Sequence, residues 1–112
     1  MLDQLKDKTY IFLINSDWEM SGGKVAAQVA NVACQLPKVK LKILEDPCTL
    51  VLSAPEDYMI RLLEVYEAKL GIKYTVDAGL TEFTVGALTC IGWKYQDWAE
   101  PLTHALPLFT VK

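Results

Sequence analysis

One short segment combines glycines, a lysine and the start of a predicted helix. Gly22, Gly23 and Lys24 precede a run of small apolar residues typical of a helix. Free backbone amides at a helix N-terminus bind anions or stabilise an oxyanion, and a lysine in that first turn opposes the macrodipole by about 0.3–1 kcal/mol. A solvated lysine on a frayed turn is the alternative. The nucleotide-binding P-loop is excluded because its first glycine is absent and because Val25, rather than serine or threonine, follows the lysine.

A second segment places a carboxylate close to several hydroxyl groups. Asp77 follows an apolar run, and Thr81, Thr84 and Thr89 come after it. A carboxylate with neighbouring hydroxyls can orient or deprotonate a water molecule as a general base in ester hydrolysis. Alternatively, Asp77 only caps backbone amides of a turn, and the threonines are present for their strand propensity.

The elements that must position these side chains alternate between strands and helices. Apolar runs predict strands at 10–14, 49–52, 72–76 and 88–91, and helical spacing predicts helices at 24–35 and 55–70, with a helical piece around 96–103. The helix at 55–70 is expected to have Ser53 or Ala54 as its cap, Pro55 at its first position and Gly71 after its end. Alternating residues at 39–43 fit a short half-exposed strand, a loop or a helix extension.

This order predicts a single α/β domain over residues 1–112. Its architecture is a three-layer α/β/α sandwich around a small mixed, mostly parallel four-stranded sheet, with one hairpin-like pair at the end. Ligands of open α/β sheets gather at the carboxyl ends of strands. The loop after the first strand and the loop that begins at Asp77 both lie at such ends, and we expect them to form one site.

Composition limits the function classes. The chain has 112 residues, is 52% hydrophobic and carries a net charge of −3, which argues against binding nucleic acid mainly through bulk positive charge. Its three cysteines show no metal-binding spacing, so we expect reduced thiols, no metal and a cytoplasmic protein. No apolar run is long enough to span a membrane. His104, the only histidine, lacks a recognisable triad partner and is expected to be structural or solvated.

Tryptophans are candidates for stacking on bases. Trp93 and Trp98 are expected in the core or at an interface, whereas the loop position of Trp18 favours ligand contact. Trp93, Trp98 and Leu102 could form an apolar contact of a homodimer, and packing of the tail on its own core explains them equally well.

Taken together, the two segments resemble the peptidyl-tRNA hydrolase 2 family, the archaeal and eukaryotic type. The family motif D-L-x-M-x-x-G-K-x-A-A-Q is similar to DWEMSGGKVAAQ at 17–28. A second motif, D-A-G-R-T-Q-x-x-x-G-x-x-T, is similar to DAGLTEFTVGALT at 77–89. The resemblance extends from about residue 12 to 109, which is nearly the whole chain.

The resemblance implies hydrolysis of the ester between a peptide and the 3′ ribose of tRNA, with no metal or organic cofactor. It implies that the catalytic residues are Lys24, Asp77, Thr81 and Thr89, with Asp77 acting on water and Lys24 on an oxyanion or a phosphate. It assigns substrate binding to a further set of positions: Asp17, Gly23, Gln28, Asn31 and Gly79.

Most departures from the family pattern remove positive charge. Family basic residues are replaced at Glu19, Leu80, Asn31 and Pro107, and Glu82 replaces a glutamine. Such residues would contact a tRNA backbone. Two functions therefore remain open: a divergent hydrolase acting on peptidyl-tRNA or a smaller ester, and a related binding module with little turnover and reduced affinity for tRNA.

Overall fold

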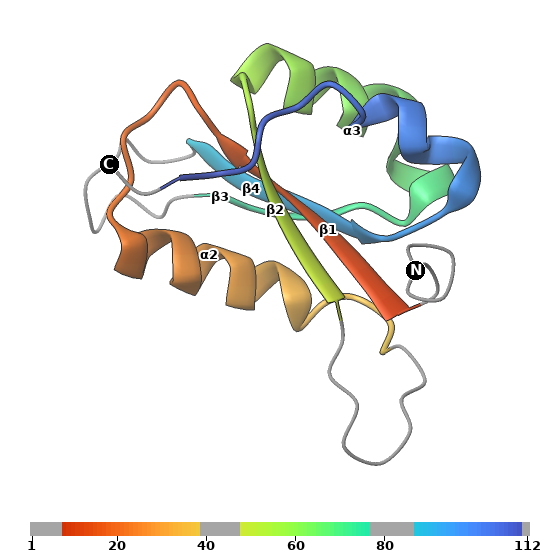
Figure 1. Cartoon of the computed structure of the whole chain (residues 1–112), viewed down its shortest axis with the longest axis horizontal. Helices are drawn as coiled ribbons and strands as arrows, with labels where there is room; N and C mark the ends of the chain where they lie inside the picture. Colours follow the sequence, from red (N-terminus) through yellow and green to blue (C-terminus); the bar gives the residue numbers. More distant parts are fainter. Residues whose placement is uncertain (1–7, 39–47, 77–86, 111–112) are drawn as a thin grey trace.

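A computed structural model describes residues 8–38, 48–76 and 87–110 (Figure 1). The strands are β1 (Thr9–Asn15), β2 (Cys48–Ala54), β3 (Lys73–Val76) and β4 (Leu88–Lys94). The helices are α2 (Gly22–Ala33), α3 (Glu56–Leu70) and the 3-10 helix η2 (Asp97–Leu102). Each of these was expected from the sequence within a few residues, whereas the expectation for 39–43 lies outside the described residues. No helix in the described ranges could cross a membrane.

The four strands form one mixed sheet in the order β2-β1-β4-β3. The predicted α/β class is confirmed, and three layers are present. The expectation of a mostly parallel sheet needs correction: only β1 and β2 pair in parallel, while β4 is antiparallel to both β1 and β3. Three strands still run in the same direction. β4 runs in the opposite direction and lies between β1 and β3, so two of the three neighbouring strand pairs are antiparallel.

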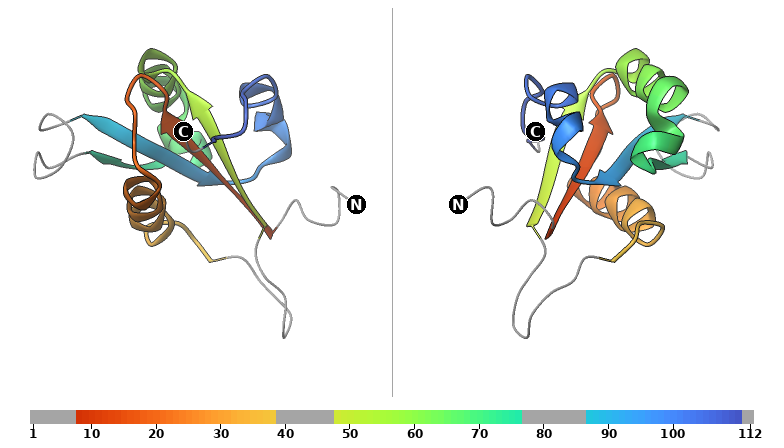
Figure 2. Two further views of the ribbon diagram at one scale, coloured as in Figure 1. Left: turned by 60° about the vertical axis from the view of Figure 1, so that its left-hand side comes forward. Right: turned by 90° about the vertical axis from the view of Figure 1, so that its right-hand side faces the viewer.

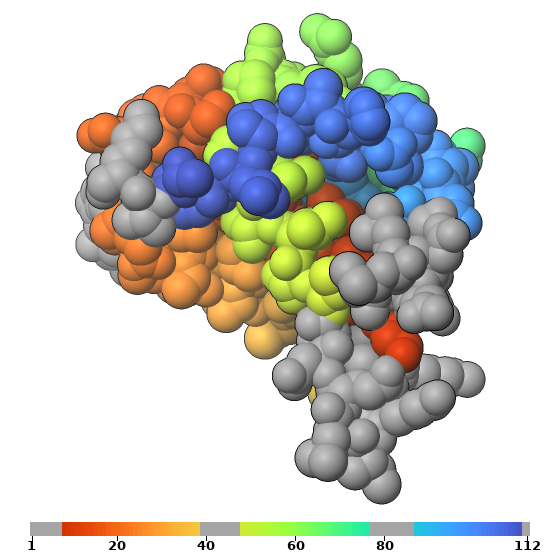
Figure 3. Space-filling view, in the orientation of Figure 1, coloured from red at the N-terminus to blue at the C-terminus, as the bar shows by residue number. Residues whose placement is uncertain are grey.

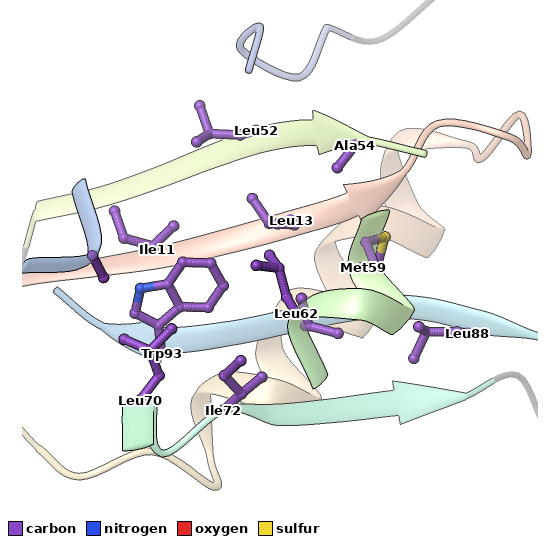
Figure 4. Close-up of a cluster of buried hydrophobic side chains, with 12 residues drawn as sticks. Ile11, Leu13, Leu52, Ala54, Met59, Leu62, Leu70, Ile72, Leu88 and Trp93 are labelled. Carbon is purple, nitrogen blue, oxygen red and sulfur yellow. The ribbon is translucent and has the colours of Figure 1, made fainter. Parts of the chain in front are cut away.

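The two long helices cover opposite faces of the sheet (Figure 2). On one face, Met59 and Leu62 of α3 pack against a cluster that includes Ile11, Leu13 and Trp93 (Figure 4). On the other face, Val25 and Val32 of α2 pack against residues that include Phe12, Ile14 and Cys90. Alternate residues of β1 therefore face opposite layers, which explains its continuous apolar run.

Helix boundaries follow the expected local rules with one shift. Gly71 ends α3 in the left-handed conformation (φ 70°), and its amide donates to the carbonyl of Glu67, as predicted. Pro55 is the N-cap of α3 rather than its first helical residue, and it offers no side-chain hydrogen bond to the helix. The N-cap of α2 is Ser21, whose hydroxyl accepts a hydrogen bond from the backbone amide of Lys24.

The C-terminal segment covers the outer edge of β2. The amide of Ser53 donates to the carbonyl of Pro107, and the amide of Phe109 donates to the carbonyl of Val51, both at 2.9 Å. Figure 3 shows this segment, in dark blue, lying across β2. The Tyr58 hydroxyl donates to the carbonyl of Leu102 and thereby ties η2 to α3. An edge strand that would otherwise expose its backbone groups is thus partly paired.

We expect Gly92→Ala to lower the free energy of unfolding by about 1–3 kcal/mol, the usual cost of overpacking a core. A Cβ atom at this position of β4 would lie 2.7 Å from Phe12 Cδ1 and 2.9 Å from Val32 Cγ1. Gly23→Ala is the matched control, because a Cβ there meets nothing within 4 Å. Urea denaturation of both variants measures the difference. An equal stability of the two variants would contradict the close approach of α2 to β4.

Candidate functional site

A buried hydrogen bond joins α2 to β4. The hydroxyl of Thr89 donates to Oε1 of Gln28 at 2.7 Å, and the carbonyl of Thr75 lies 3.2 Å from the same hydroxyl. Thr89 is completely buried and Gln28 is 6% exposed. Gln28 ends the first sequence segment and Thr89 ends the second. The two segments therefore meet at their last residues, which are 61 positions apart in the chain.

A β-bulge turns Thr89 toward α2. The register between β3 and β4 shifts, with Thr75 opposite Cys90 and Val76 opposite Leu88, which leaves Thr89 as the extra residue. Leu88 packs in the cluster under α3, whereas Cys90 packs in the cluster under α2. Regular alternation would give Thr89 the face opposite Cys90, so the bulge is what brings the hydroxyl to Gln28. Bulges often redirect side chains next to active sites.

Lys24 lies one turn before Gln28 on α2 and is partly buried. Lys24, Gln28 and Asn31 are spaced by four and three residues, so they share one side of the helix. Gln35 continues this side, and its Nε2 donates to the carbonyl of Tyr74 on β3 at 3.4 Å. We call these three residues, together with Gln35 in the turn that follows the helix, the polar face of α2. This face looks toward β3 and β4.

The structure places some of the expected site residues here and not others. Lys24, Gln28 and Thr89 lie together as just described, and Asn31 is exposed further along the polar face of α2. Asp77, Gly79 and Thr81 lie outside the described residues. The segment that carries them connects β3 to β4, the two strands next to that face.

Gly23 is exposed in the first turn of α2, and a side chain there would enter open space. The packing of the described residues therefore does not require glycine at this position. Within the same turn, the amide of Lys24 already donates to the Ser21 hydroxyl.

Asp17 caps a distant helix. Its Oδ2 accepts a hydrogen bond from the amide of Glu56, the first residue of α3, at 3.0 Å. This carboxylate supplies what the Pro55 N-cap lacks, and it also complements the positive end of the helix dipole. The position of Asp17 thus has a structural explanation, in addition to the substrate binding that the resemblance implies.

We therefore expect Asp17→Ala to lower the free energy of unfolding by about 1 kcal/mol, the typical value of an N-cap hydrogen bond. Asp17→Asn retains an acceptor oxygen and should retain most of that stability. Thermal or urea unfolding of the two variants distinguishes these cases. Equal stability of wild type and Asp17→Ala would show that this contact contributes nothing to the fold.

Asn15 is a structural residue that the sequence reasoning missed. It is completely buried at the end of β1, where its Nδ2 donates to the carbonyl of Leu88 at 2.8 Å. Its Oδ1 accepts from the amide of Asp17 at 2.9 Å. A polar residue closing an apolar run was the available signal. Asn15 connects β1 to β4 and fixes the start of the loop that leads to α2.

A cavity of about 410 Å³ lies at the carboxyl ends of β1 and β2. It is lined by Asn15, Ser16, Trp18, Glu19, Met20, Ser21, Ser53, Phe109 and Thr110, and we call it the β1-loop cavity. The expected ligand contact of Trp18 agrees with this position. Lys24, Gln28 and Thr89 do not line the cavity. The expected single site also includes the loop that begins at Asp77, which lies outside the described residues, so it stays a prediction.

Other candidate groups have structural surroundings. Burial raises the pKa of the Cys90 thiol to about 12, which keeps it protonated and a poor nucleophile at neutral pH. Trp93 is buried in the core and Trp98 packs against Tyr66, while exposed His104 contacts Glu100 at 3.0 Å. Within the described ranges, no group of three or more histidine, cysteine or acidic residues could hold a metal.

The fold and these contacts define a three-layer α/β domain with a polar helix face beside a bulged strand. Comparison with protein-family models and with curated proteins finds no match for this chain.

Proposed function

We propose that this domain is an ester hydrolase of the peptidyl-tRNA hydrolase type. The observation that carries the proposal is the buried Thr89–Gln28 hydrogen bond, which brings together the ends of the two segments that resemble that family. A bulge in β4 is needed to make this contact. Lys24 lies one turn away on the same side of α2, where a positive charge would face a ligand held beside Gln28.

The proposed reaction divides roles among these residues. Asp77, aided by Thr81, orients or deprotonates a water molecule, which attacks the ester carbonyl; the ribose 3′-hydroxyl then leaves and the peptide departs as a carboxylic acid. Lys24 and the amides of the first turn of α2 stabilise the developing oxyanion or bind a terminal phosphate. Thr89 acts on the site through Gln28, because its buried hydroxyl already donates its hydrogen to Oε1 of Gln28.

Peptidyl-tRNA is the proposed substrate, and the proposed location is therefore the cytoplasm. No metal or organic cofactor takes part in this scheme. Cys34, Cys48 and Cys90 are free thiols, which agrees with a reducing compartment. A homodimer remains a proposal that rests on exposed Trp98 alone, since Trp93 is buried within its own chain.

A binding module with little turnover is the second candidate. The specific observation in its favour is charge: the net charge is −3, and Glu19 stands in the β1 loop where the family carries a lysine. Fewer phosphate contacts mean weaker binding of tRNA. Such a module would bind an aminoacylated RNA end without releasing the acyl group.

The test is release of the N-acetyl-aminoacyl group from tRNA. Wild type should release it faster than Asp77→Asn, which keeps the shape of the side chain but removes the base. Glu64→Gln makes the same change of a carboxylate to an amide at an exposed position of α3. It is the matched control and should behave as wild type. If wild type and Asp77→Asn release the group at the same rate, the hydrolase proposal is wrong.

A further inference from the structure

The β1-loop cavity has a chemistry of its own. Trp18, Met20 and Phe109 supply apolar walls, and Ser16, Ser21 and Ser53 supply hydroxyl groups. Among the described lining residues, Glu19 is the one side chain with a formal charge. A volume of about 410 Å³ is within the range of small-molecule sites.

The walls are held in place by hydrogen bonds from three segments. The amide of Ser16 donates to the carbonyl of Ala54 at 2.8 Å, which joins the β1 loop to the end of β2. Phe109 is fixed by its bond to Val51, and Asn15 is bound to both β4 and Asp17. A site assembled before its ligand arrives loses less conformational entropy on binding.

These groups together suit a cation with an apolar body. A carboxylate pairs with an ammonium group, an indole face attracts it through its quadrupole, and the hydroxyls of Ser16 and Ser53 accept its remaining hydrogen bonds. The hydroxyl of Ser21 already accepts from the amide of Lys24. An anion would instead meet the Glu19 carboxylate without a described lysine or arginine in the lining.

We propose that the β1-loop cavity binds an ammonium group attached to an apolar or aromatic body. Two sources share this chemistry: a free amino-acid-like amine, and the α-ammonium of an aminoacyl group on a ribose. The second source rests on the proposed function, because an aminoacyl group on a ribose belongs to the class of esters that a hydrolase of this type would bind. It would extend the substrate class from blocked peptidyl esters to unblocked aminoacyl esters.

The experiment uses puromycin, in which a methoxyphenylalanine-type aminoacyl group with a free α-ammonium is joined to a nucleoside by an amide. N-acetylpuromycin is the uncharged counterpart, and O-methyltyrosine amide represents the aminoacyl part alone. Binding to the full chain is measured by calorimetry and by changes in amide NMR shifts. Because puromycin contains no ester, its binding does not depend on turnover, and failure of the hydrolase proposal would leave this measurement unaffected.

We expect puromycin to bind about tenfold more tightly than N-acetylpuromycin, as one charge-assisted hydrogen bond would give. The shifts should change at Ser16, Trp18 and Ser21. Glu19→Gln should remove the tenfold preference, whereas Glu64→Gln on α3 should retain it. Tighter binding of puromycin than of O-methyltyrosine amide assigns the site to the aminoacyl nucleoside; equal binding assigns it to a free amine.

Three results would overturn the proposal. They are the absence of binding by either amine, equal binding of puromycin and its acetylated form, and an unchanged preference in Glu19→Gln. The NMR spectrum of each variant shows whether it is folded, so loss of the fold is not mistaken for loss of the site.

Discussion

Lys24→Ala is expected to lower the rate of ester release about 100- to 1000-fold, the usual effect of removing one group that stabilises an oxyanion. Lys24 is in the first turn of α2, at the N-terminus of the helix, and one turn from buried Gln28. Lys73→Ala is the matched control because it removes the same charge from an exposed position at the start of β3. Steady-state release from N-acetyl-aminoacyl-tRNA measures both variants.

The kinetic parameters separate the two roles of Lys24. A group that acts only on the oxyanion lowers kcat, whereas a group that binds a phosphate equally in ground and transition states raises KM and leaves kcat unchanged. Lys24→Arg retains the positive charge and should recover more activity than Lys24→Ala. If Lys73→Ala loses as much activity as Lys24→Ala, the effect comes from net charge rather than from a site on α2.

Thr89→Val is expected to lower the free energy of unfolding by about 1–3 kcal/mol, because it leaves a buried acceptor of Gln28 without its donor. Valine keeps the shape of threonine, so packing changes little. The double variant Gln28→Leu/Thr89→Val should recover much of this loss. Urea denaturation of both single variants and the double variant gives the coupling energy, which is expected to be about 0.5–3 kcal/mol for groups in direct contact.

Activity distinguishes a positioning role from a purely structural one at the same contact. The double variant should be stable and inactive, because it lacks the polar groups beside Lys24. Thr89→Ser keeps the hydroxyl and should retain activity, although it loses a buried methyl group. A double variant as active as wild type would show that the Thr89–Gln28 bond serves only the fold.

Most of the elements could be predicted because their signals are local. The apolar run of β1, the amphipathic pattern of α3 and the stop at Gly71 each depend on neighbouring residues. The position of β4 could not be predicted in this way. Its place between β1 and β3 depends on pairings across the whole chain, and those pairings make two of the three neighbouring strand pairs antiparallel.

The candidate site shows the same division. The family resemblance marked Lys24, Gln28 and Thr89 as candidates, and the structure brings Gln28 and Thr89 into contact. Strand periodicity gives no indication of the bulge that turns Thr89 toward α2. The hydrogen bond between Asp17 and Glu56 of α3 joins residues 39 positions apart, so no local sequence pattern predicts it. Asp77, Gly79 and Thr81 stay predictions, since they lie outside the described residues.

The place of β4 has a consequence for synthesis on the ribosome. β4 is the last of the four strands to be made, yet it pairs with β1, the first, and with β3. Until β4 emerges from the ribosome, β1 has no hydrogen-bonding partner along one edge. Phe12 and Leu13 then lack the packing that the neighbouring residues of β4 provide. Nascent chains of this kind expose apolar strands that aggregate or recruit chaperones. The domain should therefore complete its sheet only after residue 94 has left the exit tunnel.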